Sequence, residues 1–285
     1  MSQSSEILWQ SHDGLRLYAR DYPGPTSSAP PVLCLHGLTR NSRDFEALAP
    51  HLQGRYRVIV PDLRGRGLSA RDPQPQNYQP AVYVQDLLAL LNTLDVRRMA
   101  VIGTSLGGML AMMLGFSHAA RVAGIVLNDV GPEIDPAGIE RIKQYAGRLP
   151  PARTWSNAAA QTRAVYGQAW PGLSPDRWDA LARRAYRENS AGIVEVDADP
   201  GIGEALRAAP AAALDLWPLW KALDALPILA IRGAHSDILS AATFARMKSE
   251  NPRLQQLEVA DRGHVPLLDE PECMVAVDAF LAAIL

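Results

Sequence analysis

The stretch that most constrains the fold is Val101-Ile102-Gly103-Thr104-Ser105-Leu106-Gly107-Gly108-Met109. The apolar run that begins at Met99 predicts a buried strand, and the apolar residues from Leu110 to Leu114 predict a helix. Glycines two residues before and two residues after Ser105 remove side chains where a sharp turn brings backbone segments together. We therefore expect Ser105 at the tip of a tight strand-to-helix turn.

The spacing Gly103-x-Ser105-x-Gly107 is that of a nucleophile elbow. Such a turn presents the serine hydroxyl at the end of a sheet. It also leaves the N–H of Leu106 at a helix N-terminus, where it is free to face a developing negative charge. The pattern alone also fits an ordinary serine in a glycine-rich turn, but the flanking strand and helix favour the functional interpretation.

Short apolar segments alternate with amphipathic helical segments along most of the chain. This alternation predicts an α/β fold with a mostly parallel sheet and right-handed crossovers. The wholly apolar segment 31–35 suits a strand covered on both faces. The predicted strands are residues 6–10, 15–22, 31–35, 57–60, 99–102, 122–127, 228–232 and 254–259.

Strand signals stop between residues 131 and 216. This segment is rich in Ala, Arg and Trp and is broken by Pro and Gly pairs, so we expect several helices there. The sequence thus predicts a core made of residues 1–130 and 217–285, with a helical cap of residues 131–216 inserted between two strands. Such a cap would lie over the C-terminal ends of the strands, where open α/β sheets bind their ligands.

Composition excludes several classes of partner. The 285 residues carry 28 Lys and Arg against 30 Asp and Glu, a net charge of −2, so no basic surface suggests nucleic acid. No apolar run reaches the roughly 18 residues of a membrane helix, and no signal peptide is visible, so we expect a cytoplasmic protein that acts on a small molecule. Cys34 and Cys273 show no metal-binding spacing, and we expect no metal. A homodimer is left open.

Acyl transfer needs a nucleophile, a base, a group that orients the base, and donors for the oxyanion. Ser105, Asp237 and His264 follow predicted strands in the order Ser, Asp, His. We predict Ser105 as the nucleophile, His264 as the base and Asp237 as the acid that orients it. Asp129 also follows a strand and is the alternative acid.

These motifs together resemble the α/β-hydrolase superfamily. The resemblance covers nearly the whole predicted core, and individual stretches are similar to the carboxylesterase, enol-lactonase and C–C hydrolase branch. It implies a mostly parallel eight-stranded sheet flanked by helices, with an inserted helical lid. The matching segments are His36-Gly37, Asp62-x-Arg64-Gly65-x-Gly67-x-Ser69, the Ser105 elbow, Asp237 and Gly263-His264.

The resemblance also implies roles for individual residues. The oxyanion hole would consist of the backbone N–H groups of Leu38 and Leu106, and the reaction would need no cofactor. In some relatives, the acidic residue of the catalytic triad lies at the position that corresponds to Asp129. A serine at the elbow, where other branches carry a carboxylate, favours attack on a carbonyl group.

Three residues are candidate substrate-binding groups. The planar fork of Arg40, close to the oxyanion segment, suits a substrate carboxylate, although a solvated arginine is the simpler interpretation. The predicted lid is rich in aromatic residues, most of which we expect to pack its helices together. Among them, Trp155 and Trp170 are the ones that we expect to contact substrate.

We therefore predict a serine hydrolase that cleaves a small or medium carboxylic ester or lactone through an acyl-enzyme on Ser105. One alternative uses the same residues in a C–C bond or amide hydrolase that acts on a carboxylate-bearing product of ring degradation. The other is a binding protein that has the α/β-hydrolase fold without catalysis.

Overall fold

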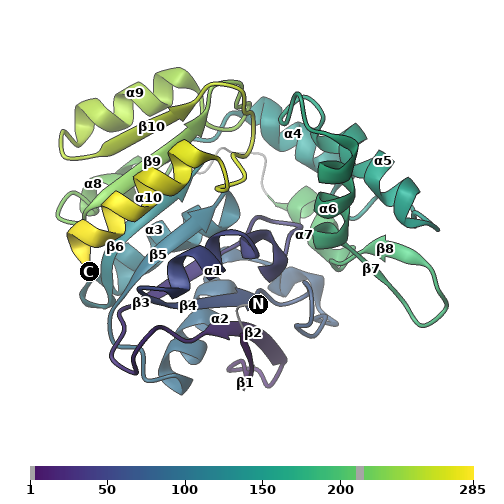
Figure 1. Cartoon of the computed structure of the whole chain (residues 1–285), viewed down its shortest axis with the longest axis horizontal. Coiled ribbons are helices and arrows are strands. Elements are labelled where there is room, and N and C mark those ends of the chain that lie inside the picture. Colours follow the sequence, from purple (N-terminus) through teal and green to yellow (C-terminus); the bar gives the residue numbers. More distant parts are fainter. Residues whose placement is uncertain (1–3, 210–214) are drawn as a thin grey trace.

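The computed structural model describes residues 4–209 and 215–285, in which eight strands form one sheet in the order β1-β2-β4-β3-β5-β6-β9-β10 (Figure 1). Five neighbouring pairs, from β4-β3 to β9-β10, are parallel, which confirms the predicted α/β class. The strands are β1 (Ser5–Gln10), β2 (Arg16–Tyr22), β3 (Pro31–Leu35), β4 (Arg57–Asp62), β5 (Met99–Thr104), β6 (Val122–Asn128), β9 (Ile228–Gly233) and β10 (Gln255–Val259).

The first two strands form an antiparallel hairpin at one edge of the sheet. Gly14 adopts a φ of 83°, in the left-handed region that a tight turn requires and glycine tolerates. β2 then pairs antiparallel with β4, so the parallel part of the sheet begins there.

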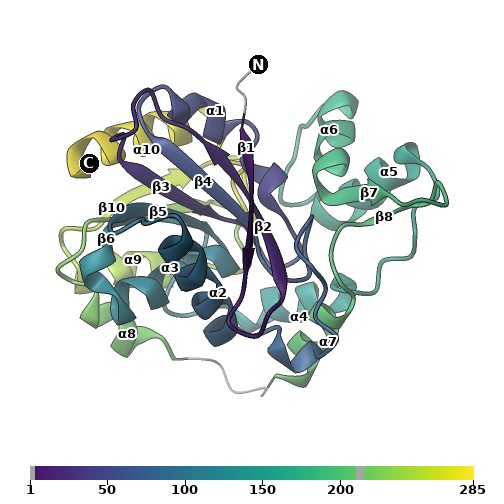
Figure 2. The same ribbon diagram turned by 90° about the horizontal axis from the view of Figure 1, so that it is seen from below.

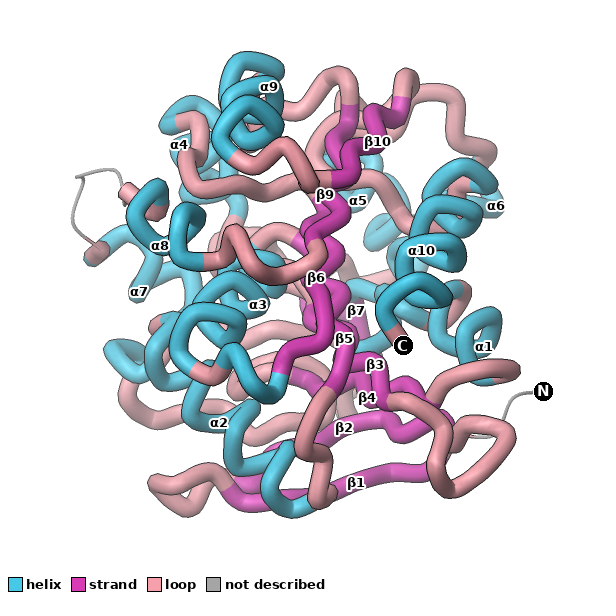
Figure 3. Tube along the Cα trace, turned by 90° about the vertical axis from the view of Figure 1, so that its left-hand side faces the viewer, coloured by secondary structure: helices cyan, strands magenta, loops and turns pink. Residues whose placement is uncertain are grey.

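Helices cover both faces of the sheet. Along β3, Val32 and Cys34 pack into one apolar cluster, and Leu33 and Leu35 pack into the other, because successive side chains point to opposite faces. Seen edge-on, α1 and α10 lie on one side of the sheet, and α2, α3, α8 and α9 lie on the other (Figure 3). These helices are α1 (Leu48–Gln53), α2 (Pro80–Thr93), α3 (Leu106–Ser117), α8 (Trp217–Ala222), α9 (Ala241–Glu250) and α10 (Pro271–Ile284).

Single 3-10 turns complete the core at three positions: η1 (Ser42–Phe45), η2 (Pro75–Asn77) and η3 (Ala119–Arg121). Asn41 caps η1, because its side chain accepts a hydrogen bond from the backbone N–H of Arg43. Within the described ranges, no helix is long and apolar enough to cross a membrane.

Among the described residues, four helices lie between β6 and α8, where the sequence predicts several, and they stand to one side of the sheet (Figures 1 and 2). They are α4 (Pro136–Tyr145), α5 (Trp155–Tyr166), α6 (Pro175–Ala185) and α7 (Gly201–Ala208). Residues 210–214 of the predicted cap lie outside the described residues. The division at residues 131 and 216 stays a prediction.

The structure shows a small β-hairpin in this region that the sequence does not predict. Strands β7 (Tyr186–Glu188) and β8 (Val194–Val196) pair antiparallel. The Asn189 side chain accepts hydrogen bonds from two backbone N–H groups of the connecting turn, and Gly192 adopts a φ of 73°. Strands of three residues are too short to show the alternation from which strands are predicted.

The cap is joined to the core by hydrogen bonds at the loop that follows β10. The Gly263 N–H donates to the Ala169 carbonyl at 2.7 Å, and the Trp170 indole N–H donates to the Val265 carbonyl at 2.7 Å. On the other side, the Asn41 side-chain amide donates to the Arg184 carbonyl at 2.9 Å. The cap is thereby tied to the segment that carries His264.

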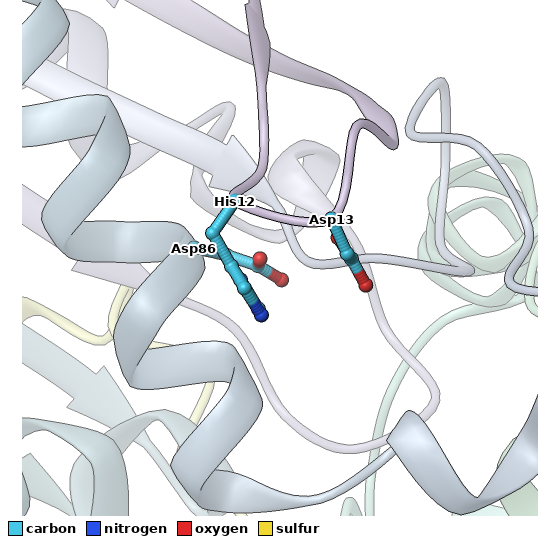
Figure 4. Close-up of side chains that lie close together, drawn as sticks. All are labelled: His12, Asp13 and Asp86. Atoms are coloured by element: carbon cyan, nitrogen blue, oxygen red, sulfur yellow. The ribbon is translucent and has the colours of Figure 1, made fainter.

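A buried guanidinium organises the turn between β1 and β2. His12, Asp13 and Asp86 come together there, close enough to suggest a metal site (Figure 4). Arg64, however, donates hydrogen bonds to both carboxylates and also to Asp72. We therefore interpret the cluster as a structural ion-pair network.

Candidate active site

Ser105 lies at the turn between β5 and α3, as the glycine spacing predicts. It adopts a φ of 52°, which is strained for a residue with a side chain, and its N–H donates to the Asn128 carbonyl at 2.9 Å. A Cβ atom at Gly107 would clash with the Leu35 carbonyl, and one at Gly103 would clash with the Gly107 backbone. The two glycines therefore permit the close approach that exposes the hydroxyl.

His264 faces this hydroxyl. Its Nε2 lies 2.9 Å from Ser105 Oγ, and the side chain is buried. The loop that carries it is held over the end of β6, because the Asn128 side-chain amide donates to the Pro266 carbonyl at 2.9 Å. Two side chains that are separated by more than 150 residues are thus placed within hydrogen-bond distance.

The carboxylate beside the imidazole is that of Asp129. His264 Nδ1 lies 2.7 Å from Asp129 Oδ2. The same carboxylate accepts hydrogen bonds from the Gly233 N–H at 2.8 Å and from the Ser236 hydroxyl at 2.6 Å, and the residue is fully buried. These donors fix the orientation of the carboxylate and leave one oxygen directed at the ring.

The structure places Asp237, the acid preferred from the sequence, elsewhere. Its carboxylate pairs with the Arg141 guanidinium on α4, which donates to it through Nε and, at 2.9 Å, through Nη2. Burial alone would raise the pKa of Asp237, but the hydrogen bond and the charge of Arg141 outweigh it, so the pKa is lowered. Asp237 therefore joins the cap to the core, and the alternative residue, Asp129, meets the imidazole.

The order of the strands explains this difference. β6 lies directly beside β5, whereas β9 is one strand further away. The loop after β10 reaches back across the end of β9, so the imidazole meets the residue that follows β6. Asp129 takes a φ of 58°, and this left-handed turn at the strand end directs its side chain toward the ring. No local pattern in the sequence favours Asp129 over Asp237, because both follow predicted strands.

The two predicted oxyanion donors flank the serine. Leu106 is the first residue of α3, and neither its N–H nor that of Leu38 donates to an acceptor among residues 4–209 and 215–285. A Cβ atom on Gly37 would lie only 3.9 Å from that of Ser105, so the segment before Leu38 passes close to Ser105. The buried Arg66 holds this segment, because its Nε donates to the Leu38 carbonyl at 2.9 Å.

His36 fixes the start of the same segment. Its Nδ1 lies 2.8 Å from the Gly37 carbonyl, and its Nε2 accepts a hydrogen bond from the Leu63 N–H at 3.1 Å. Because an N–H can only donate, Nε2 carries no proton, and the ring is neutral with its proton on Nδ1. Burial lowers the pKa of His36 to about 4.

This lowered pKa predicts a loss of stability in acid. The pKa of His36 is about 4 in the folded chain and about 6.5 in the unfolded chain, so protonation favours unfolding. The contribution of His36 to the free energy of unfolding is complete above pH 6.5. It falls by about 3 kcal/mol as the pH drops through 4. In urea unfolding between pH 7.5 and 4, H36Q should show a shallower pH dependence than the wild type. Parallel curves would contradict the assignment.

A cavity of about 60 Å³ lies beside Ser105 and His264. Trp170 lines it and stacks on Tyr166 with ring centroids 4.6 Å apart, and its contact with substrate stays a prediction. Arg40 also lines it, but its Nε donates to the Asp44 carboxylate at 2.9 Å, and its charge is thereby paired. The volume is below the roughly 300–1,000 Å³ of most ligand sites, so it suits a small substrate group.

The structure places Trp155 away from this cavity. The Trp155 indole N–H donates to Glu188 at 3.2 Å, and the Arg183 guanidinium lies 4.6 Å from the ring centroid. Trp155 packs at the edge of the cap cluster, and it does not line the cavity beside Ser105. The aromatic side chain therefore packs the cap, and contact of Trp155 with substrate stays a prediction that this cavity does not support.

A second cavity of about 200 Å³ adjoins the first and lies between the cap and the core. The lining residues that the two cavities share are Thr39, Arg40, Tyr145 and Tyr166. The two tyrosine rings meet edge to face, with centroids 6.0 Å apart, and so form part of the partition. A substrate longer than the first cavity would therefore have further room past these rings.

Two charged residues that line the first cavity are not among the site residues predicted from the sequence: Asp44 and Arg184. Asp44 lies in η1, four residues after Arg40, and its spacing fits an ion pair. Arg184 lies three residues after Leu181 on α6, and both line the cavity. The helical spacing from a buried leucine is the signal that could have identified Arg184.

Two curated proteins are similar to the chain over most of its length. The chain is 31% identical over 272 residues to a 3-hydroxybutyrate-oligomer hydrolase of Cupriavidus necator, a match that covers 90% of each chain. It is 25% identical over 257 residues to a 2-(acetamidomethylene)succinate hydrolase of Mesorhizobium japonicum, covering 90% of this chain and 89% of that one.

One of the solved structures that resemble this chain has the same fold over its whole length. An alpha/beta hydrolase from Novosphingobium aromaticivorans superimposes with a TM-score of 0.93 at 44% identity, over 99% of both chains. A family model described as alpha/beta hydrolase fold matches residues 30–271. The chain therefore belongs to the alpha/beta hydrolase fold family, and it is an enzyme of the hydrolase class.

Proposed function

We propose that the protein hydrolyses a small or medium carboxylic ester or lactone through an acyl-enzyme on Ser105. The observation that carries this proposal is the continuous hydrogen-bonded chain from Ser105 Oγ through His264 to Asp129, with distances of 2.9 and 2.7 Å. A serine hydroxyl is a weak nucleophile on its own, and an adjacent base that is itself oriented by a carboxylate activates it.

The proposed reaction has two halves. In the first, His264 Nε2 takes the Ser105 proton while Oγ attacks the carbonyl carbon, and the N–H groups of Leu38 and Leu106 stabilise the oxyanion. The imidazolium then gives its proton to the departing alkoxide, which leaves as an alcohol. In the second half, His264 takes a proton from water as the water oxygen attacks the acyl-enzyme. The bond between the carbonyl carbon and Ser105 Oγ then breaks, the imidazolium returns its proton to Oγ, and the carboxylic acid is released. Asp129 orients the imidazole and stabilises the imidazolium in both halves.

The sizes of the cavities and the relatives support an ester of modest size. The cavity beside Ser105 holds about 60 Å³, and the adjoining cavity holds about 200 Å³. A relative that is 31% identical is named for the hydrolysis of 3-hydroxybutyrate oligomers, whose units are joined by ester bonds. Such a substrate would place a short acyl group next to the serine and leave room for the rest beyond it.

A fluorophosphonate probe tests the proposal directly. We expect the folded protein to be labelled on the peptide that contains Ser105, because only an activated serine attacks phosphorus rapidly. Peptide mass spectrometry locates the adduct, and the heat-denatured protein serves as the control that should remain unlabelled. A folded protein that leaves Ser105 unmodified, or that is labelled on a different serine, would refute the proposal.

A second candidate function is amide hydrolysis with the same residues. A relative that is 25% identical is named as a 2-(acetamidomethylene)succinate hydrolase, a name that describes an acetamide on a dicarboxylic acid. Rates for a matched ester and secondary amide of one carboxylate-bearing compound separate the two functions. Faster turnover of the amide would favour this second candidate.

A further inference from the structure

The cavity beside Ser105 carries an unbalanced positive charge. Its charged lining residues are Arg40, Asp44 and Arg184. Arg40 donates to Asp44 through Nε at 2.9 Å and through Nη2 at 2.5 Å, so these two charges cancel. Within residues 4–209 and 215–285, no ion pair or hydrogen bond engages the Arg184 guanidinium, and only its backbone carbonyl is bonded across to the core.

The backbone of Arg184 is firmly placed. Its carbonyl accepts a hydrogen bond from the Asn41 side-chain amide at 2.9 Å, and the next carbonyl, of Ala185, accepts from the Asp197 N–H at 2.9 Å. Leu181, one turn earlier on α6, lines the same cavity. Arg184 is therefore held between the core and the β7-β8 hairpin, on the helix face that lines the cavity beside Ser105.

The second cavity lacks an unpaired positive charge like that of Arg184 among the described residues that line it. There, Arg71 lies 4.0 Å from Glu195, and Asp199 accepts a hydrogen bond from the Tyr78 hydroxyl at 2.7 Å. The Tyr78 hydroxyl is neutral, so the negative charge of Asp199 is not balanced by it. An anionic group is therefore favoured in the first cavity and disfavoured in the second. This difference in charge favours one orientation of an elongated substrate, with its anionic end in the first cavity.

We propose that Arg184 binds a free carboxylate of the substrate and makes the enzyme selective for carboxylate-bearing esters. A guanidinium presents two parallel N–H donors that match a carboxylate, and the partly enclosed site strengthens the pairing. The carboxylate takes no part in bond cleavage, so Arg184 acts in substrate binding. This inference rests on the proposed ester hydrolysis.

Two esters of the same shape test the inference. The first is 3-(butanoyloxy)butanoate, and the second is 3-(butanoyloxy)butanamide, in which a neutral amide replaces the carboxylate. We expect the wild type to prefer the acid, and R184M to lose about 10- to 100-fold in kcat/KM for the acid through a raised KM. Its kcat/KM for the amide should stay within about 2-fold, because the methionine keeps the apolar stem. Butyrate release, measured by chromatography, gives both values.

Arg183, the adjacent residue, offers a matched control. It lies on the same helix, packs over the Trp155 ring and does not line the cavity. R183M should keep the wild-type preference for the acid, and R184K should retain part of it, because lysine keeps the charge but lacks the planar fork. An equal loss in R183M and R184M would mean that the cap is merely destabilised and would overturn the inference.

A binding measurement separates failure of the inference from failure of the proposed function. We expect 3-hydroxybutyrate to raise the melting temperature of the wild type and R183M but not that of R184M. If the wild type hydrolyses both esters equally, or if R184M keeps the acid preference, the inference fails and the proposed function stands. If the wild type hydrolyses neither ester, the proposed function fails. Equal stabilisation of the wild type and R184M would then overturn the inference as well.

Discussion

Replacing Ser105 by alanine should lower kcat for ester hydrolysis by about 10⁴- to 10⁶-fold, the loss typical of removing the nucleophile from a triad. The alanine keeps the turn between β5 and α3 and loses only the oxygen that lies 2.9 Å from His264 Nε2. Without this oxygen no acyl-enzyme can form. The residual rate would come from the oxyanion donors and from binding alone. Initial rates with a chromogenic ester, corrected for the uncatalysed reaction, measure the loss.

Ser117 gives the matched control for this substitution. It lies at the other end of α3, is exposed, and donates to the Met113 carbonyl at 2.7 Å. S117A should retain wild-type turnover and probe labelling. If S105A keeps more than about a tenth of the wild-type kcat while its circular dichroism spectrum is unchanged, Ser105 is not the nucleophile.

Replacing Asp129 by asparagine should lower kcat by about 10³- to 10⁴-fold. The asparagine amide is able to donate to Nδ1 of His264, and this would move the ring proton to Nε2. In that tautomer Nε2 has no lone pair with which to accept the Ser105 proton. The substitution is close in shape to the native residue, so the Gly233 N–H, now 2.8 Å from the carboxylate, keeps an acceptor.

The same substitution at Asp237 discriminates between the two acids. D237N weakens the contact with Arg141 but leaves the imidazole and its partner in place. We expect its kcat to stay within about 3-fold of the wild type, with at most a small fall in melting temperature, because the pair is partly exposed to solvent. Comparable losses in D129N and D237N would show that the geometry of the unliganded site misidentifies the acid.

The sequence predicts most of the core, because local signals there agree with the tertiary structure. The segment 31–35 is apolar throughout and becomes β3, which is covered on both faces. The Asp13-Gly14 turn predicts the first hairpin, and the glycines around Ser105 predict the elbow. In each case a requirement of the backbone or of burial restricts which residues are acceptable, so the residue types reveal the conformation.

The side-chain partners of the site are harder to predict. Asp129 and Asp237 both follow strands, and the choice between them depends on where the loop after β10 runs, which no local pattern records. Arg40 lies next to Asp44, and Trp155 packs against Arg183, so both are engaged by neighbours that only the folded chain reveals. Arg184 was not predicted as a site residue, because a charged residue on an amphipathic helix usually faces water.

The hydrogen bonds from Gly263 and Trp170 across to the opposite backbone have a mechanical consequence. They flank His264, the proposed base, on both sides in sequence, so these hydrogen bonds couple the position of the lid to that of the imidazole. An outward movement of the Ala169 segment with these bonds intact would draw residue 264 away from the Ser105 hydroxyl. A substrate small enough to bind without such a movement would leave the hydrogen bonds between Ser105, His264 and Asp129 intact. A bulkier substrate would have to break them in order to bind.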